Sequence, residues 1–340
     1  MNIAPNKDQM NRHLQRTNRP RIVDVRPYQL LCLVCRLGMP SGRRRAAPPV
    51  GRLQRLIQLD PNRPLRLVCN VDGLYRYQNP GHRMNSAGGA LFNEKRDLDI
   101  LQRMGMVPGD TRPARDLIER MLQSIDTTKN LCGYADDQAT PTWRGCPQAL
   151  RGAFERGCAK AFALLIPSRP AREKDLAKKT TSAGMYRVTP LHIRPHHLMC
   201  MACFYSRQAF APIAEDNLYE ALDIMRKNPT IPVTLVRGCC MICPPCSAYD
   251  AVTGLCTGGH GMSLRDQKKD LDVLQRLDLN YGDTLPARTL YTRLFHRIRS
   301  AREICGFQDG LARGEAWTIC GTVTKRAYER SRASGMGIVR

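Results

Sequence analysis

The residues of this chain best suited to chemistry are its cysteines, of which there are 15 among 340 residues. They are densest in one stretch, which reads Cys240-x-x-Cys243-x-x-Cys246 and is followed by Cys256. This spacing is that of the first three ligands of a bacterial ferredoxin, where sulfurs from one loop bind three corners of a cluster. The sequence therefore predicts a metal centre at this loop, with Cys256 or Cys200 as the fourth ligand.

An iron–sulfur cluster of the [4Fe–4S] type is the cofactor that this spacing favours, and zinc is the alternative. Structural zinc sites commonly combine two C-x-x-C pairs. Cys243 with Cys246 and Cys200 with Cys203 would supply two such pairs. Three sulfurs on a single loop suit a cubane cluster better, because a distant fourth cysteine then completes it.

Four further cysteines recur in the two halves of the chain, within stretches that resemble each other. VDVRPYQLLCLVC corresponds to LHIRPHHLMCMAC, and the stretch DLDILQRMGMVPGDTRPAR from Asp97 corresponds to DLDVLQRLDLNYGDTLPAR from Asp270. The matched cysteines are Cys32, Cys35, Cys132 and Cys146 in the first half and Cys200, Cys203, Cys305 and Cys320 in the second. Four thiolates are what one zinc ion or one cluster requires, so these residues are predicted metal ligands. The alternative is that they are buried apolar thiols on helices.

These stretches predict a tandem duplication, in which two homologous domains position the cysteines. The predicted segments are a disordered basic tail at 1–20, a diverged first copy at 21–167, a polar linker at 168–188 and a cysteine-rich second copy at 189–335. Each copy is expected to be mainly helical, of an α-rich α+β class, with one short strand. In the second copy, apolar spacing predicts helices over Ile213–Arg226 and Pro286–Ile298, and a strand at Val233–Val236.

Two adjacent histidines, His196 and His197, precede Cys200 and are predicted to lie at the cofactor. One of them is placed to face the thiols, either as a ligand or as a hydrogen-bond donor to sulfur. The first copy has Tyr28 and Gln29 at these positions, so the role is not common to both copies. The alternative is that the pair, with Arg194, positions the start of a helix.

The motif RPHHLMC at Arg194–Cys200, the cysteine loop and a late W-x-x-C resemble the domain-of-unknown-function family 1284. Its members are described as candidate iron–sulfur proteins, and the resemblance covers the second copy from Leu191 to Cys320. It implies cluster binding, with ligands at Cys200, Cys243, Cys246, Cys256, Cys305 and Cys320. The first copy looks like a diverged second example that lacks the cysteine loop.

The composition narrows the function classes further. The net charge of +23 is compatible with an acidic redox partner protein or with nucleic acid. No basic strip interleaved with aromatic residues supports the nucleic-acid reading. No apolar run reaches the roughly 18 residues of a membrane helix, and the first twenty residues lack the apolar core of a secretory signal. We therefore expect no membrane partner, a cytoplasmic location and reduced thiols.

Electron transfer or redox sensing by an iron–sulfur protein is the function that these observations favour. The alternatives are a zinc-stabilised nucleic-acid-binding protein and a metal-dependent redox enzyme in which His196 or His197 carries a proton. The sequence has no phosphate-binding glycine loop, nucleophile elbow or H-E-x-x-H motif, so it predicts no catalytic residue and leaves open whether the chain is an enzyme.

Overall fold

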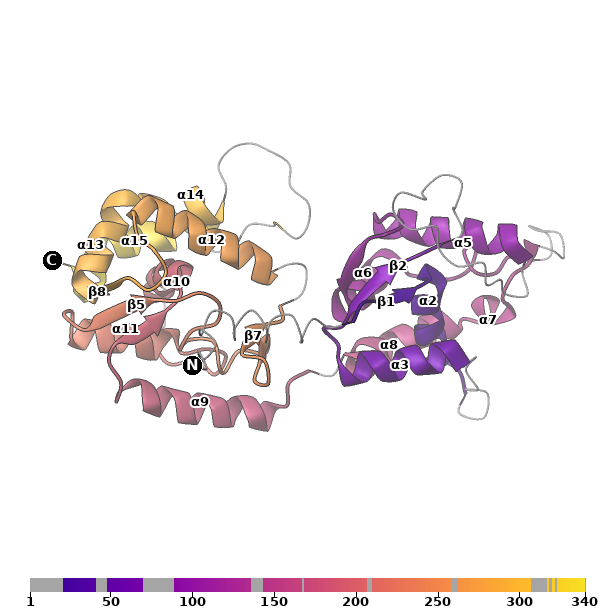
Figure 1. The fold of residues 1–340 in the computed structure, drawn as a ribbon, viewed down its shortest axis with the longest axis horizontal. Coiled ribbons are helices and arrows are strands. Elements are labelled where there is room, and N and C mark those ends of the chain that lie inside the picture. Colours follow the sequence, from indigo (N-terminus) through magenta and orange to yellow (C-terminus); the bar gives the residue numbers. More distant parts are fainter. Residues whose placement is uncertain are drawn as a thin grey trace, which may run out of the picture. The chain divides into compact units, whose positions relative to one another are not determined.

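The computed structural model divides the chain into two compact units, Met1–Pro167 and Ser168–Arg340 (Figure 1). We call them unit one and unit two and describe each by itself. The residues that the structure describes are 21–40, 48–69, 89–135, 143–166, 168–206, 210–258, 262–306, 317, 320, 321 and 323–339. The predicted disordered tail at 1–20 lies outside them.

Unit one is built of short strands and longer helices. In chain order these are β1 (Val23–Val25), α2 (Pro27–Leu37), α3 (Pro48–Leu59), β2 (Pro64–Leu67), α5 (Gly89–Met104), β3 (Thr111–Pro113), α6 (Ala114–Ser124), α7 (Pro147–Leu150) and α8 (Ala153–Leu165). The strands form one sheet in the order β1-β2-β3, in which β1 runs parallel and β3 antiparallel to β2. A parallel pair needs a crossover between its strands, and helices α2 and α3 supply it.

Unit two contains the same arrangement with additions. Its elements are α9 (Ala171–Met185), β4 (Leu191–Ile193), α10 (Pro195–Tyr205), α11 (Leu218–Lys227), β5 (Pro232–Leu235), β6 (Tyr249–Asp250), β7 (Leu255–Cys256), α12 (Met262–Leu277), β8 (Thr284–Pro286), α13 (Ala287–Arg297), α14 (Arg302–Cys305), η4 (Val323–Lys325), α15 (Ala327–Ser334) and η5 (Gly335–Gly337). Its main sheet has the order β4-β5-β8, again with a parallel and then an antiparallel pair. The hairpin β6–β7 is an addition that follows β5.

The described residues are mainly helical with small mixed sheets, which confirms the α-rich α+β class. The expectation of one strand per unit was wrong, because each unit has a three-stranded sheet. The outer strands of each sheet are only three residues long. The first outer strand is followed directly by Arg-Pro, and the last one consists of the T-x-P sequence itself. Segments this short carry too few alternating positions to be recognised as strands.

The helix that follows the first strand lies at the centre of each unit. In unit one, α2 buries Leu30, Leu31 and Val34 and packs against α8. The approach is close, because a Cβ atom on Gly157 of α8 would lie 2.0 Å from the carbonyl oxygen of Val34. In unit two, α10 packs against α12 and α15, and the buried Tyr291 donates a hydrogen bond to the Leu198 carbonyl. Each fully buried leucine of this kind contributes about 1.5–3 kcal/mol.

The segment predicted as a linker, 168–188, contains the helix α9 instead. Lys178 of α9 contacts the Glu220 carboxylate at 2.7 Å, and Tyr186, just after the helix, donates a hydrogen bond of 3.0 Å to Asp223. Met185 is buried in the core of unit two. The composition is polar because one side of the helix packs while the other is exposed, and its Ala, Lys and Glu residues are strong helix formers.

The two predicted helices of unit two are present with shifted starts. Helix α11 begins at Leu218 rather than at Ile213, and the Asp216 side chain accepts a hydrogen bond of 2.9 Å from the Leu218 amide in a turn that leads into the helix. Helix α13 and strand β5 lie within a residue of the predicted ranges. Within the described part of the chain, we find no helix with the length and apolar content needed to cross a membrane.

Candidate metal centre

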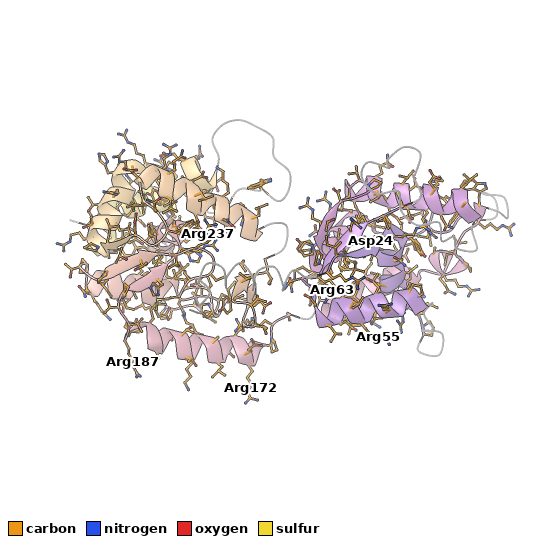
Figure 2. All side chains as sticks on the ribbon, in the orientation of Figure 1. Asp24, Arg55, Arg63, Arg172, Arg187 and Arg237 are labelled. Carbon is orange, nitrogen blue, oxygen red and sulfur yellow. The ribbon has the colours of Figure 1, made fainter. Side chains whose placement is uncertain are left out.

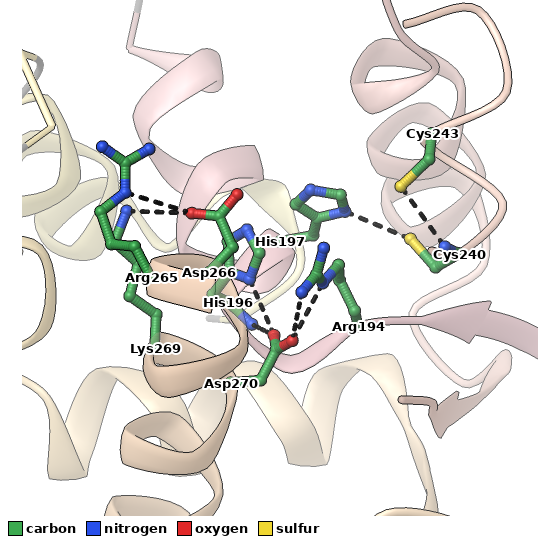
Figure 3. A network of polar contacts seen from close by, with 9 residues as sticks. All are labelled: Arg194, His196, His197, Cys240, Cys243, Arg265, Asp266, Lys269 and Asp270. Atoms are coloured by element: carbon green, nitrogen blue, oxygen red, sulfur yellow. Dashed lines mark hydrogen bonds and ion pairs between the residues drawn. The ribbon is translucent and has the colours of Figure 1, made fainter. Parts of the chain in front are cut away.

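Three side chains of unit two bring potential metal ligands together (Figure 3). His197 lies in the first turn of α10, and Cys240 and Cys243 lie in the loop after β5. One ligand atom from each of the three lies within 4.8 Å of the other two. The His197 Nδ1 atom lies 3.2 Å from the Cys240 sulfur. Zinc bound at about 2.3 Å to sulfur needs sulfur atoms about 3.8 Å apart, so the three atoms already approach metal-site spacing.

The sheet explains why these residues meet. Strands β4 and β5 are parallel, with Ile193 opposite Leu235, so their carboxyl ends lie at the same edge. Helix α10 begins directly after β4, and the cysteine loop begins directly after β5. This edge is where open α/β sheets usually bind ligands. The loop is also tied down, because Met241 donates its amide to the His192 carbonyl and accepts a hydrogen bond from Asn217 at its own carbonyl.

The Cys243 sulfur is surrounded by hydrogen-bond donors. The thiols of Cys239 and Cys240 both donate to it, and the Cys240 amide donates at 3.3 Å. These hydrogen bonds lower the pKa of Cys243 far below its ordinary value, although burial acts in the opposite direction. Donation to Cys243, with burial, raises the pKa of Cys239, and burial, with the same donation, raises the pKa of Cys240. These contacts favour the thiolate form of Cys243 and the protonated forms of Cys239 and Cys240, whose protons a metal ion would displace.

The two histidines have different roles. Burial, with the neighbouring His196, lowers the pKa of His197 to about 3, so its imidazole is neutral, as a metal ligand must be. His196 faces Asp270 instead, with its Nδ1 and its amide 2.7 and 2.9 Å from the Asp270 Oδ1 atom. The structure therefore corrects the prediction for His196, which positions the start of α10 and does not reach the sulfurs. Successive helical residues point about 100° apart, so only one of the pair faces the loop.

Asp270 is a functional residue that the sequence analysis missed. It is fully buried on α12, and its Oδ2 atom accepts hydrogen bonds from Arg194 at 2.9 and 2.7 Å. Burial alone would raise the pKa of Asp270, but the hydrogen bond and charge of His196, together with Arg194, lower it. The signal was present, because the Asp is identical in both repeated DLD stretches. In unit one, Asp97 accepts a hydrogen bond of 2.7 Å from Arg26.

Two more predicted ligands, Cys246 and Cys256, lie on the same loop. The Ala248 amide donates to the Cys246 sulfur at 3.4 Å, and Cys256 pairs with Tyr249 in the β6–β7 hairpin. Burial raises the pKa of Cys256, and Cys246 is near enough to add to that effect. A cavity of about 280 Å³ adjoins this region. It is lined by Arg194, Gly238, Cys239, Leu255, Cys256, Leu264 and Gln267.

The matched cysteines of unit two form a separate group. Burial raises the pKa of Cys200, and the nearby thiols of Cys305 and Cys203 raise it further. Cys320 acts in the same way on Cys305, and the Cys320 amide donates to the Cys305 carbonyl at 3.4 Å. Cys200, predicted as a fourth ligand of the loop, thus lies among the matched cysteines.

Unit one repeats this group at Cys32, Cys35, Cys132 and Cys146. Burial raises the pKa of Cys35, and Cys32, Cys132 and Cys146 all contribute to the rise. The Cys146 amide donates to the Cys132 carbonyl at 2.7 Å. Gln29 occupies the position that His197 has in unit two, and its side chain accepts a hydrogen bond from the Arg26 amide.

Comparison with known proteins adds no assignment, since no family model, curated protein or solved structure matches this chain.

Proposed function

We propose that unit two binds an iron–sulfur cluster at the cysteine loop and that the protein transfers electrons or senses redox state. The observation that carries this proposal is the convergence of His197, Cys240 and Cys243, whose ligand atoms lie within 4.8 Å of one another. Their chemistry fits, because hydrogen bonds favour the thiolate form of Cys243 and the imidazole of His197 is neutral.

A cluster suits the loop better than a single ion, for two reasons. The loop has more thiols than one tetrahedral ion uses, with Cys239, Cys246 and Cys256 beside the converging three. The cavity of about 280 Å³ lined by Cys239 and Cys256 also provides room beside these sulfurs. Backbone amides that point at sulfur, as those of Cys240 and Ala248 do, are a common way to tune the potential of a cluster.

The position of the loop supports the proposed redox function. Cys239, Cys243 and Cys246 are all partly exposed, so a partner protein is able to approach closely enough for electron transfer. Arg194 is 4% exposed and lines the cavity, and its positive charge favours the more negative, reduced form of a cluster. The net charge of +23 favours an acidic partner.

Zinc is the second candidate, because three N and S ligand atoms within 4.8 Å also match a single tetrahedral ion. In that case the metal would be structural and the basic surface would bind nucleic acid. Arg55, Arg172 and Arg187 are exposed and project from the helices and loops (Figure 2). The sequence-based alternative of a metal-dependent redox enzyme, with His196 or His197 as the proton carrier, remains a prediction.

We further propose that the two units arose by duplication, as the resemblance between their sequences predicts. Both sheets pair a parallel strand and an antiparallel strand with the central one, and both place the Arg-Pro dipeptide at the start of the following helix. Arg26 with Asp97 and Arg194 with Asp270 occupy the same positions in the two units. The resemblance of unit two to family 1284 stays a prediction.

The test is the visible spectrum and metal content of the full chain purified without oxygen. We expect absorption near about 400 nm, with iron and acid-labile sulfide, and we expect Cys240→Ser with Cys243→Ser to remove the contribution of this centre. Cys158→Ser, a half-buried cysteine of unit one, is the matched control and should change nothing. If the protein is colourless and contains zinc that the same double variant loses, the centre binds zinc and not an iron–sulfur cluster. Absence of both metals would refute the proposal.

A further inference from the structure

Unit one has its own group of four cysteines, although it lacks the cysteine loop. Cys32 and Cys35 lie three residues apart on α2 and thus share one side of the helix. Both are half-buried against the core of unit one. Two cysteines on adjacent turns of a helix that starts directly after a strand present two sulfurs in one direction.

The other two cysteines come from the segment between α6 and α7. Gly133 pairs with Gly145 in an antiparallel bridge, and the Cys146 amide donates to the Cys132 carbonyl at 2.7 Å. Gly145 has a φ of 70°, and a Cβ atom there would lie 2.4 Å from the Cys132 carbonyl oxygen. The bridge therefore holds Cys132 and Cys146 side by side, and only glycine fits at its tightest point.

The two pairs of cysteines pack against the same core. Cys132 is buried in the same core cluster that Cys32 and Cys35 pack against. Cys146 is close enough to raise the pKa of Cys32, and Cys132 is close enough to raise the pKa of Cys35. Burial is the main reason that the pKa of Cys32 rises to about 12. The exposed Cys146 forms the outer side of the group.

A buried cation lies beside these thiols. Arg96 on α5 is 5% exposed, and its guanidinium stacks over the Tyr28 ring at 3.9 Å. Its Nη2 donates to Asn93, but its Nε has no hydrogen-bond partner within the described residues. The nearest carboxylate of the described ion pairs is Asp97 at 4.0 Å, which already binds Arg26. A buried cation is expensive unless an anion compensates it, and the charge of Arg96 acts on Cys32 and Cys132.

We propose that unit one binds a metal centre of its own through Cys32, Cys35, Cys132 and Cys146, with Arg96 as its charge partner. Four thiolates around a divalent ion carry a net charge of about −2, which supplies a second anion for Arg96 besides Asp97, a carboxylate that Arg96 shares with Arg26. Iron in a cluster and zinc as a single ion share this ligand chemistry, and metal analysis distinguishes them. This site goes beyond the proposed function, because it uses none of the residues of the cysteine loop.

Unit two supports the inference by repeating the same pattern with one change. Lys269 takes the place of Arg96 in the matched stretch, is 4% exposed, and acts on Cys200 and Cys305. Its Nζ lies 3.4 Å from the Asp266 carboxylate (Figure 3). An ammonium cannot reproduce the planar fork of a guanidinium. What the two units have in common is therefore a buried positive charge close enough to act on two of the four matched thiols.

The experiment measures iron, acid-labile sulfide and zinc in the full chain, in a Cys240→Ser and Cys243→Ser background that disables the loop. Adding Cys146→Ser should lower the metal content by one centre, that is by four iron and four sulfide or by one zinc. Because Cys146 is exposed, its substitution does not disturb the core. Cys158→Ser in the same background is the matched control and should retain the metal.

A second pair of variants tests the charge partner. Arg96→Lys should keep the metal of unit one, whereas Arg96→Met should lose it by at least about tenfold in affinity, as removal of a supporting group does. Unchanged metal in the Cys146→Ser variant, or a Cys132–Cys146 disulfide found by mass spectrometry in protein prepared without oxygen, would overturn the proposal. Because the loop is disabled throughout, failure here is distinguishable from failure of the proposed function.

Discussion

Unit one and unit two share a scaffold and differ in what is attached to it. Both have the same three-stranded sheet, a buried Arg–Asp pair, four matched cysteines and a buried cation. Only unit two has a cysteine loop after its central strand, and only unit two has histidines at the start of the helix that follows its first strand. The difference teaches that the scaffold does not depend on the loop, because unit one folds without one.

The buried Arg–Asp pairs of the two units differ in the pKa of the aspartate, because unit one has Tyr28 where unit two has His196. Burial raises the pKa of Asp97, and Arg26 only partly offsets that effect. The pKa of Asp270 is lowered, because His196 donates to the same carboxylate in addition to Arg194. In unit one the residue at the position of His196 is Tyr28, which offers only its amide, at 3.2 Å from Asp97.

The largest expected effect comes from removing the arginine of each pair. Arg26→Met leaves Asp97 buried without its main partner and should lower the free energy of unfolding of unit one by about 3–5 kcal/mol. Arg194→Met should cost unit two less, because His196 still binds Asp270. Urea unfolding followed by fluorescence reports the two units separately, since Trp143 lies in unit one and Trp317 in unit two.

The exposed Arg55 and Arg172 provide matched controls, and their substitution by Met should leave the free energy of unfolding nearly unchanged. Equal losses in Arg26→Met and Arg194→Met would contradict the compensating role of His196.

A smaller effect is expected where a helix crosses the central helix of each unit. Gly157→Ser places a Cβ atom 2.0 Å from the Val34 carbonyl oxygen, so we expect overpacking to cost about 1–3 kcal/mol. In unit two the matching carbonyl, that of Ala202, accepts a hydrogen bond of 2.5 Å from Ser331. Ser331→Ala should therefore cost only about 1 kcal/mol.

Thermal and urea unfolding of the full chain measure both changes. Gly184→Ser is the control, because a Cβ atom at that helical glycine meets nothing within 4 Å. A Gly157→Ser variant as stable as this control would show that the two helices are able to separate.

The smallest effect is a difference in pH dependence between the units. The lowered pKa of Asp270 contributes stability above its unfolded value of about 3.9, and this stability is lost as pH falls through the folded value. The raised pKa of Asp97 acts with the opposite sign, so unit one is relieved of a destabilising charge as pH falls through that raised value. A tenfold difference in proton affinity between the folded and unfolded states corresponds to about 1.4 kcal/mol of stability.

Comparing each of Asp97→Asn and Asp270→Asn with the unchanged protein, from neutral pH to about pH 3, measures this difference. The free-energy difference for Asp270→Asn should shrink with acidification, while that for Asp97→Asn moves the other way. Parallel curves for the two variants would contradict the opposed pKa shifts.

The sequence predicted which residue types gather in each unit better than it predicted how their side chains are directed. The repeat located the matched cysteines, and the C-x-x-C spacing located the loop, because both are local patterns of residue type. It did not separate His196 from His197, since adjacent helical positions differ only in direction. Asp270 lies far along the chain from Arg194, and nothing in their local sequence shows that they pair.

Helix α9 and the short strands were missed for a different reason. The polar composition of residues 168–188 resembles that of a linker, and only the contacts with Glu220 and Asp223 show that one side packs. The three-residue strands are defined by their neighbours across the sheet, which a local pattern does not contain.

Helix α12 supplies none of the three converging ligand atoms, yet its Asp270 helps to position one of them. The Asp270 carboxylate accepts hydrogen bonds from the His196 amide and from the Arg194 guanidinium. These bonds hold the backbone at the start of α10 and so orient His197 toward the Cys240 sulfur. The direction of the imidazole thus depends on a carboxylate of α12. Substitutions along α12 that move this carboxylate would therefore change the direction of His197 and weaken the proposed metal centre, although they replace none of its ligands.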